Sequence, residues 1–350
     1  MSARDLFLTG AKAAGGFWLA DRVRPAGIPI LCYHGFSRVD EHRFRPALFI
    51  RPEEFERRLV WLLRSGYKVI ALAEALERLE GGRLEGGRLG KREVVLTIDD
   101  GFHTVGSVGW PLLKKYNLPA TLYVTTYYAT HPNPIFRLAI QYFFWKTARQ
   151  RASLGDLCPA LTPGDDLQRD RMWQLIRWAE TELSEDARWR LAQEVAARLD
   201  VDAEELRSSR RLSLLTVPEL AELARDGLDL QLHTHRHTLP VDPHDVTREI
   251  SQNRGVLQGI SGDRPLVHFC YPSGEWSTHH WPTLGALGIR SATTCEPGFN
   301  TAGTPPLRLY RFLDSEELSQ RDFEAELSGF KSVLRAVRGA KAAPMAAAAG

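Results

Sequence analysis

The chain has 350 residues, 43% of them hydrophobic, which is enough to bury the core of one large α/β domain or of two smaller ones. Its 45 lysine and arginine residues nearly balance 43 acidic residues, and the formal net charge of +2 gives no support to a nucleic-acid partner. The four cysteines are far apart and form no CxxC pair, which argues against a structural zinc ribbon or a disulfide framework.

Residues 1–27 form an extension ahead of the first predicted strand. They contain basic residues but no uninterrupted apolar segment, and Asp5 and Asp21 argue against a secretory signal. No stretch approaches the roughly 18 apolar residues of a membrane span. We therefore expect a cytoplasmic protein without a transmembrane segment. The composition of the extension is also compatible with an amphipathic helix that lies on a membrane or on a partner surface, which would give peripheral membrane contact.

Strands and helices alternate along the first part of the chain. The segment 28–36 reads as a buried strand ending in polar residues, and the continuous apolar run in 92–101 is typical of a strand buried on both faces of a parallel sheet. A tandem repeat, LEGGRLEGGR at 79–88, reads as a flexible turn expanded by duplication. The other elements expected here are a helix at 51–66, a strand at 67–72, a helix at 73–82, a helix at 109–119 and a strand at 120–126.

The pattern changes at about 131–215, where three segments have helical spacing and no strand is evident. We interpret this part as a helical insertion or lid whose many aromatic residues serve packing. The alternation then resumes, which predicts an α/β fold with parallel strands in a distorted or incomplete (β/α) barrel over 28–335. The elements expected there are helices at 215–227, 246–262 and 281–289 and strands at 228–235, 266–274 and 290–298. The tail, 336–350, is of low complexity and predicted to be disordered.

Two groups of polar residues follow predicted strands. Asp99 and Asp100 end the strand at 92–101, and adjacent carboxylates disfavour each other's ionisation unless a cation lies nearby. His233, His235 and His237 come where another strand ends, and neutral imidazoles are common metal ligands. In a β/α barrel both groups would open onto the C-terminal face. Two histidines and a carboxylate would give a metal three protein ligands and leave a coordination position for water or substrate, as in a catalytic metal site.

The sequence around these residues resembles the polysaccharide deacetylases of the NodB-homology type, also called carbohydrate esterase family 4. The resemblance covers roughly 28–130 and 215–315 and leaves the helical insertion outside. It rests on four motifs: TIDDG at 97–101, HTHRH at 233–237, FCYPSG at 269–274 and PILCYHGF at 29–36. The last two resemble the branch of the family that acts in exopolysaccharide modification and carries an N-terminal YH motif.

This resemblance implies a metal-dependent hydrolase that removes N-acetyl groups from a sugar or polysaccharide, with one divalent metal ion, expected to be Zn²⁺. The residues it assigns to the metal are Asp100, His233 and His237. Asp99 is the expected general base, and Thr234 occupies the hydroxyl position that braces the loop. His235 falls on a variable position and is left out of the metal site. Such a metal would polarise the amide carbonyl, acidify its water and keep both neighbouring carboxylates ionised.

The remaining roles are less well marked in the sequence. Because Pro272 has no amide hydrogen, the backbone N–H of Ser273 is the first donor after Tyr271 for the tetrahedral oxyanion. Tyr271 and Trp276 are expected to contact the substrate, with Trp281 as an alternative to Trp276. The family's arginine, Asp-Trp and late L-x-H motifs are not visible. The general acid is therefore expected from elsewhere, with His34 favoured because it ends its strand on the same face as Asp99 and His103 as the alternative.

Two other classes of function remain open. One is an amidase or deformylase acting on a lipid-linked or small-molecule substrate. The other is a carbohydrate-binding protein whose catalytic site has decayed, although the four metal-site and base residues argue against it. The sequence identifies neither the sugar, nor the polymer length, nor the oligomeric state.

Overall fold

The computed structural model describes residues 3–81, 92–159 and 169–337. The strands are β1 (Ile30–Tyr33), β2 (Gly35–Phe36), β3 (Phe49–Ile50), β4 (Lys68–Val69), β5 (Glu93–Ile98), β6 (Thr121–Val124), β7 (Asp229–Leu232), β8 (His268–Cys270), β9 (Ser291–Thr293) and β10 (Phe312–Leu313). The helices before the insertion are α1 (Ala3–Ala13), α2 (Gly16–Val23), α3 (Glu41–Phe44), α4 (Pro52–Arg64), α5 (Leu72–Gly81) and α6 (Trp110–Lys115). The later helices are α7 (Phe136–Lys146), α8 (Arg169–Glu182), α9 (Glu185–Leu199), α10 (Ala203–Ser209), α11 (Val217–Arg225), α12 (Pro243–Gln258), α13 (Trp281–Ala286), α14 (Gln320–Leu327) and α15 (Phe330–Val337).

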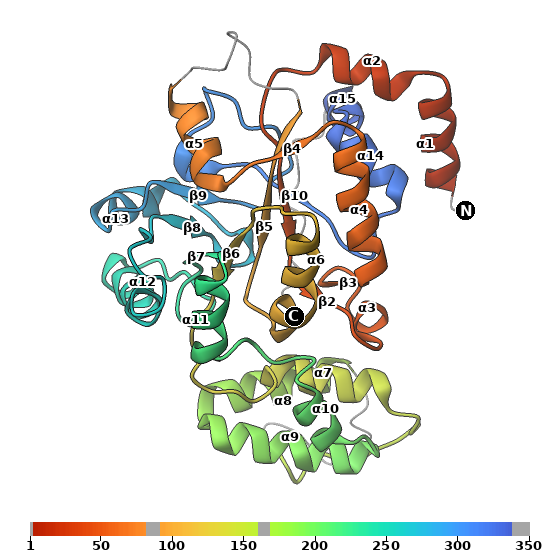
Figure 1. Ribbon diagram of the computed structural model, residues 1–350. Helices are drawn as coiled ribbons and strands as arrows, with labels where there is room; N and C mark the ends of the chain where they lie inside the picture. Colours follow the sequence, from red (N-terminus) through yellow and green to blue (C-terminus); the bar gives the residue numbers. More distant parts are fainter. Residues whose placement is uncertain (1–2, 82–91, 160–168, 338–350) are drawn as a thin grey trace.

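The main sheet is parallel and has the order β10-β1-β5-β6-β7-β8-β9, with β4 paired to the start of β5. Its two ends meet through a parallel bridge between Thr293 in β9 and Leu309, just ahead of β10. There the Leu309 amide donates to the Ala292 carbonyl at 2.8 Å. The predicted distorted (β/α) barrel is therefore confirmed, with short strands and helices around it (Figure 1).

The apolar runs of the sequence explain why the barrel forms. All residues of β1 and β5 are buried, as expected for parallel strands covered on both faces. A continuous hydrophobic core packs these strands against α4, α6, α11 and α12. Because the strands run in one direction, their carboxyl ends all lie at one end of the barrel, where loops can bring polar side chains together.

Helices α7 to α10 form a separate lobe at that end of the barrel (Figure 1). The chain returns from the lobe along the barrel, where Ser213 accepts a hydrogen bond from the His103 amide and the Leu215 amide donates to the Gly101 carbonyl. The segment that leaves the lobe is thus hydrogen-bonded to the residues that directly follow Asp100.

Several elements differ from those expected. The strand predicted at 67–72 is only Lys68–Val69, the extension forms two helices, and β10, α14 and α15 were not predicted. The repeat at 79–88 and the tail at 336–350 fall largely outside the described residues. Within the part of the chain that is described, no helix is both long and apolar enough to cross a membrane.

Candidate active site

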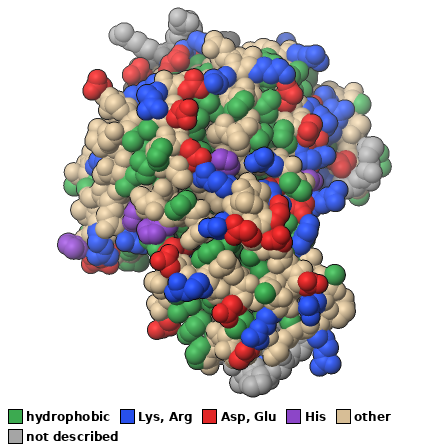
Figure 2. Space-filling view, turned by 60° about the horizontal axis from the view of Figure 1, so that its bottom comes forward, with side chains coloured by type: hydrophobic (Ala, Val, Ile, Leu, Met, Phe, Trp, Pro, Cys, Tyr) green, Lys and Arg blue, Asp and Glu red, His purple; other side chains and the backbone are tan. Residues whose placement is uncertain are grey.

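Polar residues follow three strands at the same end of the barrel. His34 follows β1, Asp99 and Asp100 follow β5, and His233 follows β7. Strands β1 and β5 are neighbours, and only β6 separates β5 from β7, so the parallel sheet brings these residues to one place. Figure 2 shows histidine side chains at the surface of the barrel above the helical lobe.

Asp100, His233 and His237 form a compact group of potential metal ligands. The Nε2 atoms of His233 and His237 lie 3.3 and 3.4 Å from the Asp100 Oδ1 atom. One ligand atom from each of the three residues lies within 4.8 Å of the others. Burial opposes ionisation of Asp100, but the adjacent histidines outweigh it and lower its pKa to about 2. Burial also lowers the pKa of His237 to about 4, so its neutral imidazole can serve as a ligand.

Hydrogen bonding around His233 supports a cation among these three residues. Its Nδ1 atom lies 2.9 Å from the Cys270 carbonyl oxygen, and a carbonyl can only accept, so Nδ1 carries the proton. Burial opposes a charge on His233, but Cys270 and the hydrogen bond to Asp100 outweigh it and raise the His233 pKa. In the neutral imidazole that a metal would bind, the Nε2 lone pair faces the Asp100 carboxylate. A divalent cation would satisfy both, and such an outer bond to a ligand histidine is common in metal sites. The side chains present therefore fit a divalent metal.

The backbone around this group is strained. Seven non-glycine residues among those described have positive φ angles, and four of them belong to the predicted site. These four are Asp100 at 70°, Thr234 at 61°, His237 at 57° and Ser273 at 57°. Left-handed conformations cost free energy in residues with a Cβ atom, and they often persist at functional sites.

Asn253 on α12 holds the loop that carries the histidines. It is fully buried, accepts a hydrogen bond from the His233 amide at 3.0 Å and donates to the Val124 carbonyl and the Thr126 hydroxyl at 2.9 and 3.1 Å. Thr234, expected to brace this loop, is buried, and its hydroxyl has no hydrogen-bond partner among the described residues. The side-chain hydrogen bonds that hold this loop therefore come from Asn253 and not from Thr234.

Asp99 is paired with a buried arginine that the sequence analysis did not identify. Arg311 donates from Nη1 to Asp99 Oδ1 at 2.7 Å and from Nη2 to Oδ2 at 2.8 Å. Its Nε atom donates to the Thr294 carbonyl at 2.8 Å. Burial alone would raise the pKa of Asp99, but the Arg311 charge and its two hydrogen bonds outweigh it and hold the pKa below the usual range.

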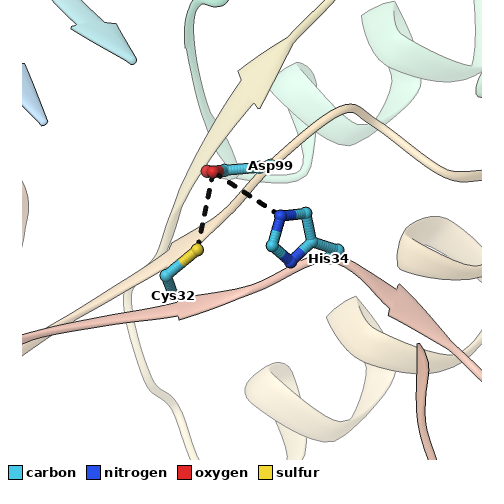
Figure 3. Close-up of side chains that lie close together, drawn as sticks. All are labelled: Cys32, His34 and Asp99. Carbon is cyan, nitrogen blue, oxygen red and sulfur yellow. Dashed lines mark hydrogen bonds and ion pairs between the residues drawn. The ribbon is translucent and has the colours of Figure 1, made fainter. Parts of the chain in front are cut away.

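Two buried thiols also surround the Asp99 carboxylate. The Sγ atoms of Cys32 and Cys270 lie 3.5 and 3.4 Å from Asp99 Oδ2. Figure 3 shows that Cys32, in β1, and His34, directly after β1, both point toward Asp99. Burial raises the pKa of Cys32, so this residue stays a neutral thiol. The described cysteines are free, as expected for small buried residues in strands.

The two candidate acids lie in different surroundings. The Nε2 atom of His34 lies 3.9 Å from Asp99 Oδ2, and its side chain is partly exposed (Figure 3). The His103 side chain pairs through Nδ1 with Glu219 on α11 at 3.4 Å. Only His34 of the two therefore contacts the predicted base.

His235 and Ser273 occupy places consistent with their expected parts. His235 points away from the metal group and bonds through Nδ1 to the Thr126 hydroxyl at 2.9 Å. Ser273 lies in the short turn Pro272–Gly274 after β8, and its amide has no acceptor among the described residues. That amide remains available as a donor.

The two aromatic residues expected at the substrate are packed. Tyr271 is fully buried, and its hydroxyl donates to the Leu307 carbonyl at 2.9 Å, so the expectation that it contacts substrate is corrected. Trp276 is half-buried, with Trp281 stacked against it and the Arg308 guanidinium 4.3 Å from its ring centroid. A role for Trp276 in binding substrate stays a prediction.

The fold and this group of side chains agree with the comparisons to known proteins. The family model described as "Polysaccharide deacetylase" matches residues 86–154 and 195–292. The first segment contains Asp99 and Asp100, and the second contains His233 and His237. The chain is therefore similar to the polysaccharide deacetylase family over these two segments.

Two curated relatives match shorter parts of the chain. One, named "Putative polysaccharide deacetylase YxkH", is from Bacillus subtilis and is 31% identical over 101 residues, which cover 29% of this chain and 33% of the relative. The other is the poly-beta-1,6-N-acetyl-D-glucosamine N-deacetylase of Escherichia coli K12, 27% identical over 94 residues, which cover 27% of this chain and 13% of the relative. The matches thus span a third or less of each relative.

A solved structure supports the fold along most of the chain. The Streptococcus pyogenes deacetylase PplD, determined in complex with acetate, has a TM-score of 0.56 and 19% sequence identity. The superposition covers 87% of this chain and 99% of PplD. At this identity the likeness concerns the fold alone.

Proposed function

We propose that this protein is a metal-dependent hydrolase that removes N-acetyl groups from a sugar polymer. One observation carries the proposal: two histidines and Asp100 converge on one point, next to a second carboxylate, Asp99, that a buried arginine keeps ionised. This arrangement places a ligand set and a base side by side at the open end of the barrel.

We assign the metal to Asp100, His233 and His237, and we propose zinc because two imidazoles and one carboxylate are among its usual catalytic ligands. When bound, the ion supplies a Lewis acid for the amide carbonyl and lowers the pKa of water. The cation would further stabilise the ionised form of Asp100, beside the Asp99 carboxylate that Arg311 keeps ionised.

Asp99 accepts a proton from the attacking water. Arg311 fixes the orientation of the Asp99 carboxylate through two parallel hydrogen bonds, so that the carboxylate is held for proton transfer before substrate arrives. The thiols of Cys32 and Cys270 enclose the same carboxylate and keep its surroundings poor in water.

His34 and Ser273 complete the chemistry. His34 is partly exposed and lies next to Asp99, so it can donate a proton to the leaving amine. The Ser273 amide, without an acceptor among the described residues, donates to the oxygen that gains negative charge in the tetrahedral intermediate. The His103–Glu219 pair supports His34 over His103 as the acid.

We propose a polymer of N-acetylated hexosamine as the substrate class. Support comes from the matched family and from the Escherichia coli relative, whose name specifies poly-beta-1,6-N-acetyl-D-glucosamine.

The test is release of acetate from β-1,6-linked N-acetylglucosamine oligomers, from chitin oligomers and from the N-acetylated monosaccharide, with N-formylated sugars and glycolipids in parallel. We expect zinc-loaded protein to release acetate from an oligomer and to release less from the monosaccharide. Formate release without acetate release would identify a deformylase instead. Folded, metal-loaded protein that releases neither acid would contradict the proposal and support a decayed site.

A further inference from the structure

The N-terminal helices carry apolar residues on two faces. One face packs inward, where Leu8 of α1 and Phe17 of α2 join Ala325 of α14 in a small core. The outward face of the two helices exposes large apolar side chains, which we call the N-terminal apolar face. Its members are Leu6, Phe7, Trp18, Leu19 and Val23, each between 52% and 66% exposed.

The spacing of these residues in the sequence places them along one side of each helix. Leu6 and Phe7 are followed by the exposed residues Gly10, Ala13 and Ala14, and Trp18 and Leu19 by Val23, which are helical intervals. A soluble surface helix normally turns only polar side chains outward, whereas these two helices expose large apolar side chains as well as burying Leu8 and Phe17.

The apolar surface continues onto a third helix. Helix α2 contacts α15, and α15 exposes Val333 and Val337. Seven of the eleven exposed large apolar side chains among the described residues lie on α1, α2 and α15, and the other four are scattered. Such clustering marks an interaction surface.

Two ion pairs of α1 with α14 expose their cations and bury their anions. Arg4, with 56% of its side chain exposed, pairs at 2.6 Å with Asp322, which is 5% exposed. Lys12, 41% exposed, pairs at 2.5 Å with Glu324, which is 4% exposed. Arg22 lies 4.5 Å from the ring centroid of the exposed Trp18. Exposed basic side chains therefore lie on the same helices as the exposed apolar ones.

We propose that α1, α2 and α15 bind the protein peripherally to a membrane that contains anionic lipids. Apolar side chains enter the headgroup and upper acyl region, Trp18 lies at the interface, and Arg4, Lys12 and Arg22 meet lipid phosphates. This interaction is independent of the deacetylase chemistry.

The proposal also orients the enzyme. Figure 1 shows α2 and α15 at the opposite end of the barrel from the helical lobe, whereas the catalytic residues follow the strand ends that face the lobe. A membrane held at α1, α2 and α15 leaves that end directed away from the lipid. This orientation suits a sugar chain that extends from the membrane and does not suit a sugar at the lipid headgroup.

Vesicle flotation of the full-length protein tests the proposal. We expect the protein to float with vesicles of phosphatidylglycerol and phosphatidylcholine, and to float much less with phosphatidylcholine alone. A Phe7→Ser/Trp18→Ser double variant should lose affinity for the anionic vesicles by about tenfold or more, because two apolar side chains no longer leave water. Its acetate release from soluble oligomers should not change.

The matched control is Val39→Ser/Val241→Ser, which removes two exposed apolar side chains outside the three helices and should float like wild type. Arg22→Glu, a reversal of one exposed charge, should weaken binding without removing any apolar side chain. Wild-type protein that floats with neither vesicle would overturn the proposal. So would a double variant that floats like wild type. A wild-type dimer that the double variant abolishes, without vesicle binding, would assign this face to a second copy.

Discussion

Arg311 and Asp99 form a buried ion pair in which both carboxylate oxygens accept from one guanidinium. A pair of this kind fixes the plane of the carboxylate as well as its charge. We predict that Arg311→Lys lowers kcat by about 100-fold, since lysine keeps the charge and loses the paired geometry. Bound zinc should stay near one equivalent by elemental analysis.

The matched control for this variant is Arg308→Lys. Arg308 lies three residues earlier and pairs with Glu296 at 2.9 Å, away from Asp99. Its substitution should leave kcat within a few-fold of wild type. An Arg311→Lys enzyme with normal kcat would show that the orientation of Asp99 does not limit turnover.

The two aspartates should separate catalysis from metal binding. Asp99→Asn should keep its zinc and lose turnover by roughly 10²- to 10⁴-fold, because it removes the base and leaves the three proposed metal ligands in place. Asp100→Asn should lose most of its zinc, because three protein ligands leave no redundancy. Elemental analysis and kcat on the same samples decide between the roles. If Asp99→Asn is metal-free and regains activity when zinc is added, Asp99 is a ligand.

The candidate acids can be compared directly. His34→Ala should lower kcat by about 100-fold or more with metal and fold retained, since the leaving amine loses its proton donor. His103→Ala should stay near wild-type kcat, because His103 pairs with Glu219 and does not contact Asp99. The opposite result, with an active His34→Ala enzyme and an inactive His103→Ala enzyme, would assign the acid to His103.

Residues within short motifs could be predicted from the sequence, and residues supplied from a distance could not. Asp99 and Asp100 are adjacent, and His233 and His237 lie on one loop, so short motifs mark them, and the family resemblance is what left His235 out of the metal site. Arg311 reaches Asp99 across 212 positions of sequence. The sequence marks Arg311 locally only by the apolar pair that follows it, Phe312 and Leu313, which forms β10.

Strand length decided which elements could be predicted. The run at 92–101 contains β5, six buried residues in succession. β10 has only two residues, and a run that short has no periodicity to detect. Its position depends on pairing with Leu31 and Cys32, far away in the sequence. Strand β4 is shorter than the strand predicted at 67–72 for a related reason, because it pairs only with the first residues of β5.

The helical lobe is joined to the barrel by a charged cluster around Asp40. This residue, in the loop before α3, accepts hydrogen bonds from Arg211 at 2.8 Å, from Lys146 at 2.5 Å and from the Tyr142 hydroxyl at 3.2 Å. Lys146 and Tyr142 belong to α7 and Arg211 follows α10. One carboxylate thus connects the two ends of the lobe to the barrel.

Asp40→Asn should lower the free energy of unfolding at pH 7 by about 1–3 kcal/mol, because two cations lose their anionic partner. Burial opposes the ionisation of Asp40, but Lys146 and Arg211 outweigh it and lower its pKa in the folded protein. The stabilisation is therefore present above the unfolded pKa, about 4, and is lost as the pH falls through the lower folded value.

Urea unfolding at several pH values measures this difference. The gap between wild type and Asp40→Asn should be constant at neutral pH and should close as the pH falls below about 4. Asp156→Asn is the control, since its pair with Arg198 is exposed and should contribute little. A gap that does not depend on pH would mean that Asp40 acts through packing or neutral hydrogen bonds.

In the molecule as a whole, the barrel separates the sites of the two proposed activities. The ends of β1, β5 and β7 carry the proposed catalytic residues and face the lobe, and helices α2 and α15 lie at the other end (Figure 1). Variants at one end should therefore leave the other property unchanged, which allows catalysis and membrane binding to be measured independently.

The proposed function requires that the group formed by Asp100, His233 and His237 hold a metal for the deacetylation. The most direct measurement is acetate release from N-acetylglucosamine oligomers by protein stripped of metal with a chelator and then titrated with zinc. We predict that activity falls to background on stripping and returns fully at one equivalent of zinc per chain. Full acetate release by protein that elemental analysis shows to be metal-free would contradict this account.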